Sequence, residues 1–308
     1  MITDDYLLRL ASESKAESYM AESHSRSIRI MPFGDLQKGE PGFNKELWQE
    51  WKRQALSDPN AYLIGMGDYL DKFRPTIRHA VDSILIKDQE AKHQFDEMIM
   101  EDMQKFAEEL KPFKHRIIGL HTGHHKIDFS AGGINSDQYL GQLLGCKYLG
   151  FLSFINLVIA RGNPEKKSKL NKKPIRVSVK IFSTHGCGGS SFSHSDMANL
   201  ERKIMPFWDA DIFLRGHSAK VYAAAGAPLF KLSRGRNGTP PKIRRHVRWI
   251  INTGGFMEGY VRNATTYVEE KNLPPAALGW VTIEIRVQDH ALEPIVITPT
   301  LHAPERFG

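Results

Sequence analysis

The stretch of this sequence that says most about its fold is residues 61–71, Ala61-Tyr62-Leu63-Ile64-Gly65-Met66-Gly67-Asp68-Tyr69-Leu70-Asp71. The first six are mainly apolar, and a short apolar run that ends in a turn residue is typical of a buried strand. Two aspartates, Asp68 and Asp71, follow directly after the turn. A strand that ends in acidic side chains predicts a ligand site at its carboxyl end.

Four more runs of this kind lie on either side of residues 61–71, and each is followed by Asp or His. They are residues 28–33 before Gly34-Asp35-Leu36-Gln37, residues 116–120 before Thr122-Gly123-His124-His125, residues 177–182 before Thr184-His185-Gly186, and residues 211–214 before Gly216-His217-Ser218. Because ligands of α/β sheets bind beyond the carboxyl ends of strands, we expect the five strand ends to converge. One such residue alone means little, whereas five in succession predict a site.

Helical patterns separate these strands. Apolar residues recur on one helix face over residues 43–55, 95–110, 139–144 and 197–204, and core packing is the simplest interpretation of these faces. Alternating strands and helices predict an α/β sandwich, and its second half is indicated by later strands over residues 248–252, 279–287 and 294–299. We expect one domain over residues 26–308, preceded by a polar N-terminal extension, residues 1–25, that forms a loose helix outside the core.

A site of carboxylates and imidazoles suits the hydrolysis of phosphate esters. A phosphoester is anionic and resists attack by another anion, so cations held by such ligands help by neutralising its oxygens and lowering the pKa of bound water. A central carboxylate can bridge two cations about 3.5–4 Å apart. Mixed nitrogen and oxygen ligands favour Mn, Fe or Zn over Mg or Ca.

The order of these motifs resembles the signature of the calcineurin-like metallophosphoesterases: Asp-x-His, Gly-Asp-x-x-Asp, Gly-Asn-His-(Asp/Glu), His-Gly and Gly-His-x-His. The resemblance runs from about residue 28 to residue 220, and residues 250–256 (IINTGGF) resemble the late strand and glycine turn of the family. Gly186-Cys187-Gly188-Gly189 looks most like the glycine-rich loop of members encoded by bacteriophages. The resemblance implies a four-layer αββα sandwich, with a metal site at the strand carboxyl ends and phosphoesterase activity.

The same resemblance implies a role for each matching residue. Asp68 would be the bridging carboxylate, and Asp35 would be a ligand of the first metal. His185 and His217 would bind the second metal. His125 would contact the substrate phosphate and protonate the leaving oxygen. Asp71 would orient its neighbours rather than bind metal.

Four positions depart from the signature. Gln37 and Ala219 stand where the family has histidine ligands of the first metal, while His124 and Lys126 replace Asn and an acid. Ala219 has no ligand atom, and the amide oxygen of Gln37 is a weaker ligand than imidazole. Both losses therefore fall on the first metal site.

The departures predict two unequal metal sites. The second site would gather four ligands: Asp68, His124, His185 and His217. The first would keep two carboxylates, Gln37 and water, and Mg could fill it because Mg retains several waters. We expect one firmly bound divalent metal, with Mn favoured over Zn, Fe or Mg, and a second that is weak, exchangeable or absent.

The formal net charge of +7 is concentrated in two segments, residues 161–174 and 231–248. The first contains six Lys or Arg and one Glu, and the second contains seven Lys or Arg and no acid. Gly, Pro and Asn in both predict basic loops or hairpin ends. Two interpretations stay open: solvated loop tips, or contacts with the phosphates of DNA or RNA through Arg234, Arg236, Arg244 and Arg245.

The leading hypothesis is therefore an enzyme, a metal-dependent phosphoesterase that hydrolyses phosphodiesters of nucleic acid in the manner of a nuclease. A small nucleotide or a phosphoprotein is the alternative substrate. The competing hypothesis is a weakened phosphoesterase fold that binds nucleic acid or a protein and uses its metal structurally. Gln37 and Ala219 favour the second hypothesis, and the retained Asp68, His125 and His185 favour the first.

The composition fits a folded protein, with 41% hydrophobic and 25% charged residues. No apolar run approaches the roughly 18 residues of a membrane span, and the acidic N-terminus lacks the pattern of an export signal. Two cysteines, Cys146 and Cys187, predict no disulfide framework, and we expect Cys187 to be a small buried residue. These features predict a cytoplasmic protein without a membrane partner, in the host cytoplasm if a phage encodes it.

Overall fold

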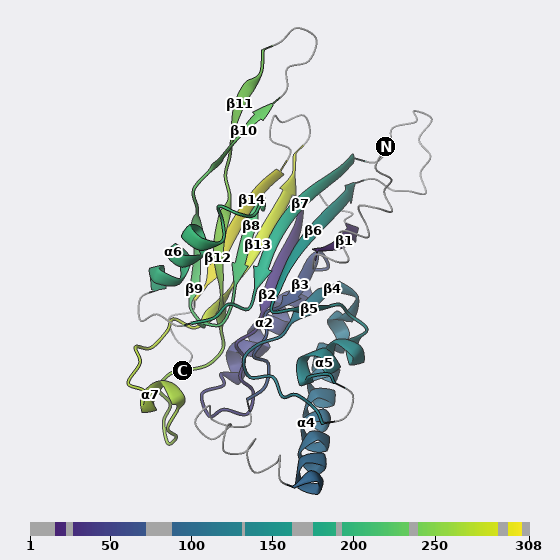
Figure 1. Cartoon of the computed structure of the whole chain (residues 1–308), viewed down its shortest axis with the longest axis vertical. Coiled ribbons are helices and arrows are strands. Elements are labelled where there is room, and N and C mark those ends of the chain that lie inside the picture. Colours follow the sequence, from purple (N-terminus) through teal and green to yellow (C-terminus); the bar gives the residue numbers. More distant parts are fainter. Residues whose placement is uncertain are drawn as a thin grey trace.

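The computed structural model of the chain describes residues 16–22, 27–71, 88–130, 133–161, 175–188, 193–233, 240–288 and 295–303. Over these residues the fold is mixed α/β, with helices packed against a large sheet (Figure 1), as the sequence predicts. None of the helices in these ranges is both long and apolar enough to cross a membrane.

All but two of the described strands form one large hydrogen-bonded sheet with two halves. Four strands of one half are parallel: β2 (Ser27–Phe33), β3 (Ala61–Gly65), β4 (Ile117–His121) and β5 (Tyr148–Gly150). Three strands of the other half are also parallel: β7 (Ile175–Thr184), β8 (Ile212–Arg215) and β12 (Trp249–Gly255). The halves join where Gly254 and Gly255 of β12 pair with β13 (Gly279–Val287), which is itself antiparallel to β2.

The remaining strands of the sheet extend these two halves. The antiparallel additions are β14 (Ile295–His302) on β13, β9 (Val221–Ala225) on β12, and β6 (Leu152–Arg161) on β7. β1 (Ala16–Glu22) runs parallel to β6 at the edge. Residues 16–22 are therefore a strand, and the predicted loose helix is wrong for this part of the extension, whereas residues 1–15 lie outside the described residues.

Three buried clusters hold the elements together. One joins the two halves of the sheet through aliphatic side chains such as Ile30 and Ile64 from one half and Leu157 and Ile181 from the other. A second lies between the first half and three helices: α2 (Lys45–Ser57), α4 (Gln89–Leu110) and α5 (Ser136–Leu144). The third lies between the other half and α6 (Ser193–Lys203). The carboxyl ends of the parallel strands are left at the edge of this packing.

Helix α2 shows how the sequence fixes the loop that precedes it. The Asn44 side chain accepts a hydrogen bond from the Leu47 backbone N–H at 2.8 Å, which begins the helix. Trp48 and Trp51 are almost fully buried and stack with their ring centroids 4.8 Å apart. Burial of α2 therefore anchors residues 34–44 at the end of β2.

A short 3-10 helix, η1 (Lys111–Arg116), links α4 to β4, and one-turn helix α7 (Tyr267–Glu270) lies between β12 and β13 in the sequence.

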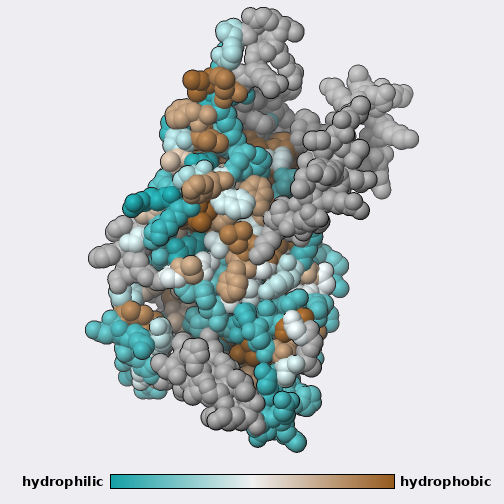
Figure 2. Space-filling model, in the orientation of Figure 1, coloured by the Kyte–Doolittle hydropathy of each residue, from teal (hydrophilic) through white to brown (hydrophobic). Residues whose placement is uncertain are grey.

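The described part of the second basic segment is a hairpin. β10 (Leu229–Ser233) and β11 (Lys242–His246) pair antiparallel, which confirms the predicted hairpin (Figure 1). Phe230, Leu232 and Ile243 are exposed on it, and Figure 2 shows hydrophobic side chains gathered at this end of the molecule. In the first basic segment only Arg161 is described, at the end of β6, and residues 162–174 lie outside the described residues.

Candidate metal centre

The loops that follow β2, β3, β4, β7 and β8 are tied together by hydrogen bonds. The backbone N–H of His217 donates to Asp35 Oδ2 at 2.9 Å, and that of His125 donates to Asp68 Oδ1 at 2.9 Å. Gly123 makes this approach possible, because a Cβ atom there would lie 2.0 Å from Asp68 Oδ1. The structure thus brings the five predicted strand ends to one place.

Backbone strain is concentrated in these loops. Among the described non-glycine residues, seven have a positive φ, and five of the seven belong here: Asp35, Gln37, Asp68, His217 and Ala219. Left-handed backbone is disfavoured for residues with a Cβ atom and persists only where the surrounding structure enforces it. Such strain clusters at functional sites, so its position here indicates a ligand site.

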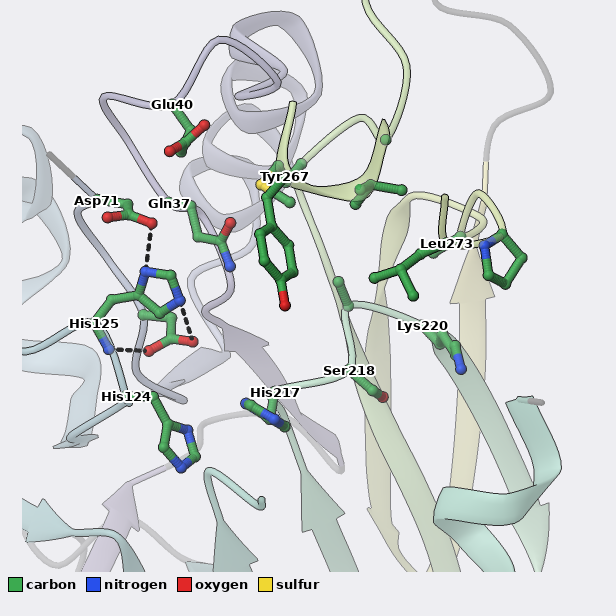
Figure 3. A pocket seen from close by; sticks show the side chains of 17 residues that line it. Gln37, Glu40, Asp71, His124, His125, His217, Ser218, Lys220, Tyr267 and Leu273 are labelled. Atoms are coloured by element: carbon green, nitrogen blue, oxygen red, sulfur yellow. Dashed lines mark hydrogen bonds and ion pairs between the residues drawn. The ribbon is translucent and has the colours of Figure 1, made fainter. Parts of the chain in front are cut away.

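Four side chains, each from a different one of these strand ends, form a candidate metal site. One ligand atom from each lies within 4.8 Å of the others: Asp68, His124, His185 and His217. Ligands about 2.1 Å from one transition metal lie up to roughly 4 Å apart, so small movements would place all four around one cation. Asp68 and His185 are buried, while His124 and His217 face the pocket shown in Figure 3. Three imidazoles with one carboxylate suit Mn, Fe or Zn.

The hydrogen bonding of His185 leaves one ring nitrogen available as a ligand. Its Nδ1 lies 2.6 Å from the carbonyl oxygen of Met66, and because a carbonyl only accepts, Nδ1 carries the proton. In the neutral ring Nε2 then holds a lone pair, buried without a hydrogen bond and 3.3 Å from Asp68 Oδ2. A backbone carbonyl on the far nitrogen is the usual support of a metal-binding histidine. The Nδ1 of His217 and the Oδ1 of Asp35 are likewise buried without a hydrogen-bond partner.

The electrostatics of the cluster attract positive charge. Burial would lower the pKa of His185, but the negative charge of Asp68 close to Nε2 raises it to about 9. Burial would raise the pKa of Asp68, but His185 and His125 hold it well below its usual range. Burial lowers the pKa of His217 to about 4, and the neighbouring His185 and His124 add to that effect. Asp68 therefore stays anionic and His217 neutral, the forms in which both groups bind a metal.

His125 and Asp71 form a pair beside the cluster. His125 Nδ1 lies 2.5 Å from Asp71 Oδ2, and both side chains are largely buried. This leaves His125 Nε2 directed at Asp68 Oδ2, 3.8 Å away, at the wall of the pocket (Figure 3). A histidine held by a carboxylate at one nitrogen can hold or give up a proton at the other.

The residues predicted for a first metal lie close to the cluster. Asp35 is fully buried, and burial raises its pKa to about 7. Gln37 and Ala219 both line the pocket, and Ala219 packs so closely that a Cβ atom on Gly255 would lie 2.7 Å from its own. The structure therefore places the two substituted positions in the same cavity as the cluster.

Two supporting residues were not predicted from the sequence. Asp137 accepts hydrogen bonds from the Thr122 hydroxyl at 2.9 Å and from the Gly123 backbone N–H at 3.0 Å, which fixes the loop after β4. Burial raises the pKa of Asp137 to about 6. Arg215 donates to the carbonyl oxygens of Cys187 at 2.9 Å and Gly188 at 3.0 Å, which holds the loop after β7. In the sequence, Asp137 lies in the helix-capping pattern Asn135-Ser136-Asp137. Arg215 is marked only by its position directly before Gly216.

Some candidates lie elsewhere. Arg244 and Arg245 are on β11, before the start of β12, whereas the cluster lies beyond the other end of β12, so the structure does not bring them to the site. Arg234 and Arg236 lie outside the described residues, and contact of any of the four with phosphate stays a prediction. Cys187 is exposed, so the expectation that it is buried is wrong. Arg215 binds the carbonyl oxygen of Cys187, which leaves the side chain outside.

Comparison with known proteins yields only distant likenesses. No family model matches the chain, and no curated protein matches it. A conserved uncharacterized protein from Streptococcus pneumoniae TIGR4, described as a predicted phosphoesterase, is 12% identical, with 90% of this chain and 98% of that chain covered and a TM-score of 0.30. Vps29 from Chaetomium thermophilum is 10% identical, with 90% and 98% covered and a TM-score of 0.27. The same protein with a cyclic peptide is 9% identical, with 91% and 98% covered and a TM-score of 0.27. TM-scores this low do not establish a shared fold, so the site stands on its own residues.

Proposed function

We propose that the chain is a metal-dependent phosphoesterase of the calcineurin-like metallophosphoesterase class, which hydrolyses phosphodiesters. The observation that carries this proposal is the four-ligand cluster beside the His125–Asp71 pair. A cation site alone would fit many proteins, but a proton-carrying histidine at its edge adds the second group that ester cleavage requires. The proposal includes a four-layer αββα sandwich over residues 26–308 as one domain, which the two helix-covered halves of the sheet support.

The metal would be held by Asp68, His124, His185 and His217. When bound, the cation supplies positive charge that neutralises phosphate oxygens and lowers the pKa of water. The Met66 carbonyl keeps His185 in the tautomer that presents Nε2 to the site. Asp35, through its bond to the His217 backbone, fixes the loop that presents His217. Mn is our first choice of metal because the donor set is mixed, and Zn and Fe follow.

His125 would act on the substrate itself. Its Nε2 lies at the pocket wall, where it can donate a hydrogen bond to a phosphate oxygen and then a proton to the leaving oxygen as the P–O bond breaks. Asp71 on Nδ1 orients the ring and stabilises its protonated form. The alkoxide or phenoxide would otherwise leave as an anion, so protonation matters most for poor leaving groups.

Hydrolysis of bis(4-nitrophenyl) phosphate should appear when Mn²⁺ is added to metal-free protein and disappear when a chelator removes it. Release of 4-nitrophenolate, followed by absorbance, measures this directly. Heat-inactivated protein with the same Mn²⁺ controls for hydrolysis by the ion alone. A wild-type protein that binds Mn²⁺ but releases no product would sink the hydrolase proposal.

We further propose that the two metal sites are unequal. Gln37→His together with Ala219→His should raise the metal content from about one to about two equivalents, because both positions face the pocket and imidazole is a stronger ligand than an amide or a methyl group. Metal analysis after dialysis measures the content. Ala219→Ser, which adds no strong ligand, is the control. About two equivalents in the wild type would refute the unequal pair.

A second candidate function rests on the same two positions. Loss of imidazole at Gln37 and Ala219 favours a binding module that keeps one metal for structure and recognises a partner. The hydrolysis assay separates the two functions, since a module would bind metal without turnover. Nucleic acid is a weaker candidate as substrate or partner, because the described arginines of the basic hairpin lie at the opposite end of β12 from His125. The likeness to bacteriophage members and the cytoplasmic location stay predictions.

A further inference from the structure

The pocket over the cluster has a second wall of different chemistry. Its volume is about 600 Å³, and one side carries His125 and three residues of the metal site, Asp68, His124 and His217. The opposite side comes from residues 257–276 and is mostly apolar: Met257, Tyr267, Val268, Leu273, Pro274 and Ala276. Figure 3 shows Tyr267 and Leu273 facing the cavity from across His217 and Ser218. None of these apolar residues belongs to the three core clusters of the described residues, so they face the cavity instead of the core.

This apolar wall is held in place before any ligand arrives. The backbone N–H of Glu258 donates to the carbonyl oxygen of Gly42 at 2.7 Å, which ties the start of the segment to the loop before α2. Leu273 is fixed twice, because its N–H donates to the Val268 carbonyl at 2.9 Å and its carbonyl accepts from the Tyr260 hydroxyl at 2.9 Å. Thr266, which is fully buried, caps α7 by accepting from the Glu269 N–H at 3.2 Å. A wall fixed in this way loses little conformational entropy on binding.

The two walls select for a molecule with two unlike ends. A phosphate at the cluster occupies only the polar side, and it leaves the apolar side facing water unless the ester carries an apolar group. Leu273 keeps 38% of its surface exposed in this position, an area that a ligand would cover. Tyr267 offers a ring for stacking. Small-molecule sites with these features typically measure about 300–1,000 Å³.

Resting on the function proposed above, we propose that residues 257–276 form a subsite for a flat apolar group of a small phosphate ester, with Tyr267 and Leu273 as its specificity-determining residues. The substrate class is thus a small aryl- or nucleobase-bearing phosphoester. A nucleic-acid strand or a phosphoprotein would present its phosphate on a long chain, for most of which a pocket of about 600 Å³ has no room.

Binding of two phosphonates tests this subsite without requiring turnover. Phenylphosphonate and methylphosphonate share the anionic head group and differ only in the apolar group, so titration calorimetry of the Mn²⁺-loaded protein isolates the wall. We expect phenylphosphonate to bind at least about tenfold more tightly, since burial of a phenyl ring contributes that much. Tyr267→Ala and Leu273→Ser should each reduce the ratio of the two Kd values towards one, with the loss mainly on phenylphosphonate.

Two control variants separate the subsite from general effects. Tyr267→Phe keeps the ring and should keep the ratio, while Leu143→Ser changes a leucine of nearly equal exposure, 39%, on α5 outside the pocket and should change nothing. Equal Kd values in the wild type, no binding of either phosphonate, or a ratio unchanged in both wall variants would overturn the proposal. Binding with the expected ratio of Kd values but without hydrolysis would overturn only the proposed hydrolase function. Hydrolysis together with a Kd ratio of one would overturn only the subsite.

Discussion

Asp68→Asn should weaken metal binding by more than about 100-fold and remove metal-dependent hydrolysis, because even the loss of a residue that merely supports a ligand costs about 10–100-fold. Asparagine keeps the shape of the side chain and an acceptor for the His125 backbone N–H, which lies 2.9 Å from Oδ1. It removes the negative charge that faces His185 Nε2 at 3.3 Å. Calorimetric titration with Mn²⁺ and metal analysis after dialysis measure the loss.

Asp211→Asn is the matched control for this prediction. Asp211 is also a buried carboxylate, which accepts from the Lys180 backbone N–H at 2.7 Å and pairs with His246, but it precedes β8 at the end opposite to the cluster. We expect this variant to be less stable yet to bind metal like the wild type. Unchanged metal binding in Asp68→Asn would remove Asp68 from the centre of the site.

The sequence predicts most of the cluster because a simple rule of sheet geometry applies to it. Asp68, His185 and His217 each follow a short apolar strand, and those strands lie parallel, so their carboxyl ends share one edge. Apart from the loose helix expected in residues 1–25, the predicted strands and helices are present, since burial on one or both faces leaves a clear periodic pattern. His124 entered the prediction because it follows the strand of residues 116–120 and stands where the family signature has Asn.

The supporting contacts could not be predicted because they join residues that are far apart in the sequence. Arg215 reaches the carbonyls of Cys187 and Gly188 only after β7 and β8 have paired, and Asp137 meets Gly123 only after α5 has docked. Neither contact leaves a local pattern. The pocket wall of residues 257–276 is a similar case, because its apolar residues follow no strand or helix period.

Charge alone does not predict where a phosphate would bind. Residues 231–248 are rich in Lys and Arg, but composition does not show at which end of a strand such a hairpin lies. Strand β12 follows the hairpin directly and leads to the cluster only at its far end, Gly255. The edge strand of residues 16–22 was missed because its sequence, AESYMAE, has no regular alternation of apolar and polar residues.

His125→Ala should lower kcat by about 10²–10⁴-fold while leaving the metal content unchanged, the range expected when a positioned proton donor is lost. His125 lies beside the cluster and is held by Asp71, with 2.5 Å between Nδ1 and Oδ2. The loss should be larger for a diester that releases phenolate than for one that releases 4-nitrophenolate, since only the poorer leaving group needs the proton. Asp71→Asn should give a smaller fall, about 10–100-fold, by loosening the ring.

His246→Ala is the control that makes the His125 result specific. His246 Nε2 pairs with Asp211 Oδ1 at 2.6 Å, so this variant also breaks a histidine–carboxylate pair, but one at the opposite end of β8. Steady-state kinetics with both leaving groups, together with metal analysis, should show full activity for it. A parallel loss of metal and activity in His125→Ala would make His125 a ligand instead of a proton donor. Equal losses for the two leaving groups would show that His125 binds the phosphate without protonating the leaving oxygen, because only proton transfer depends on the basicity of that oxygen.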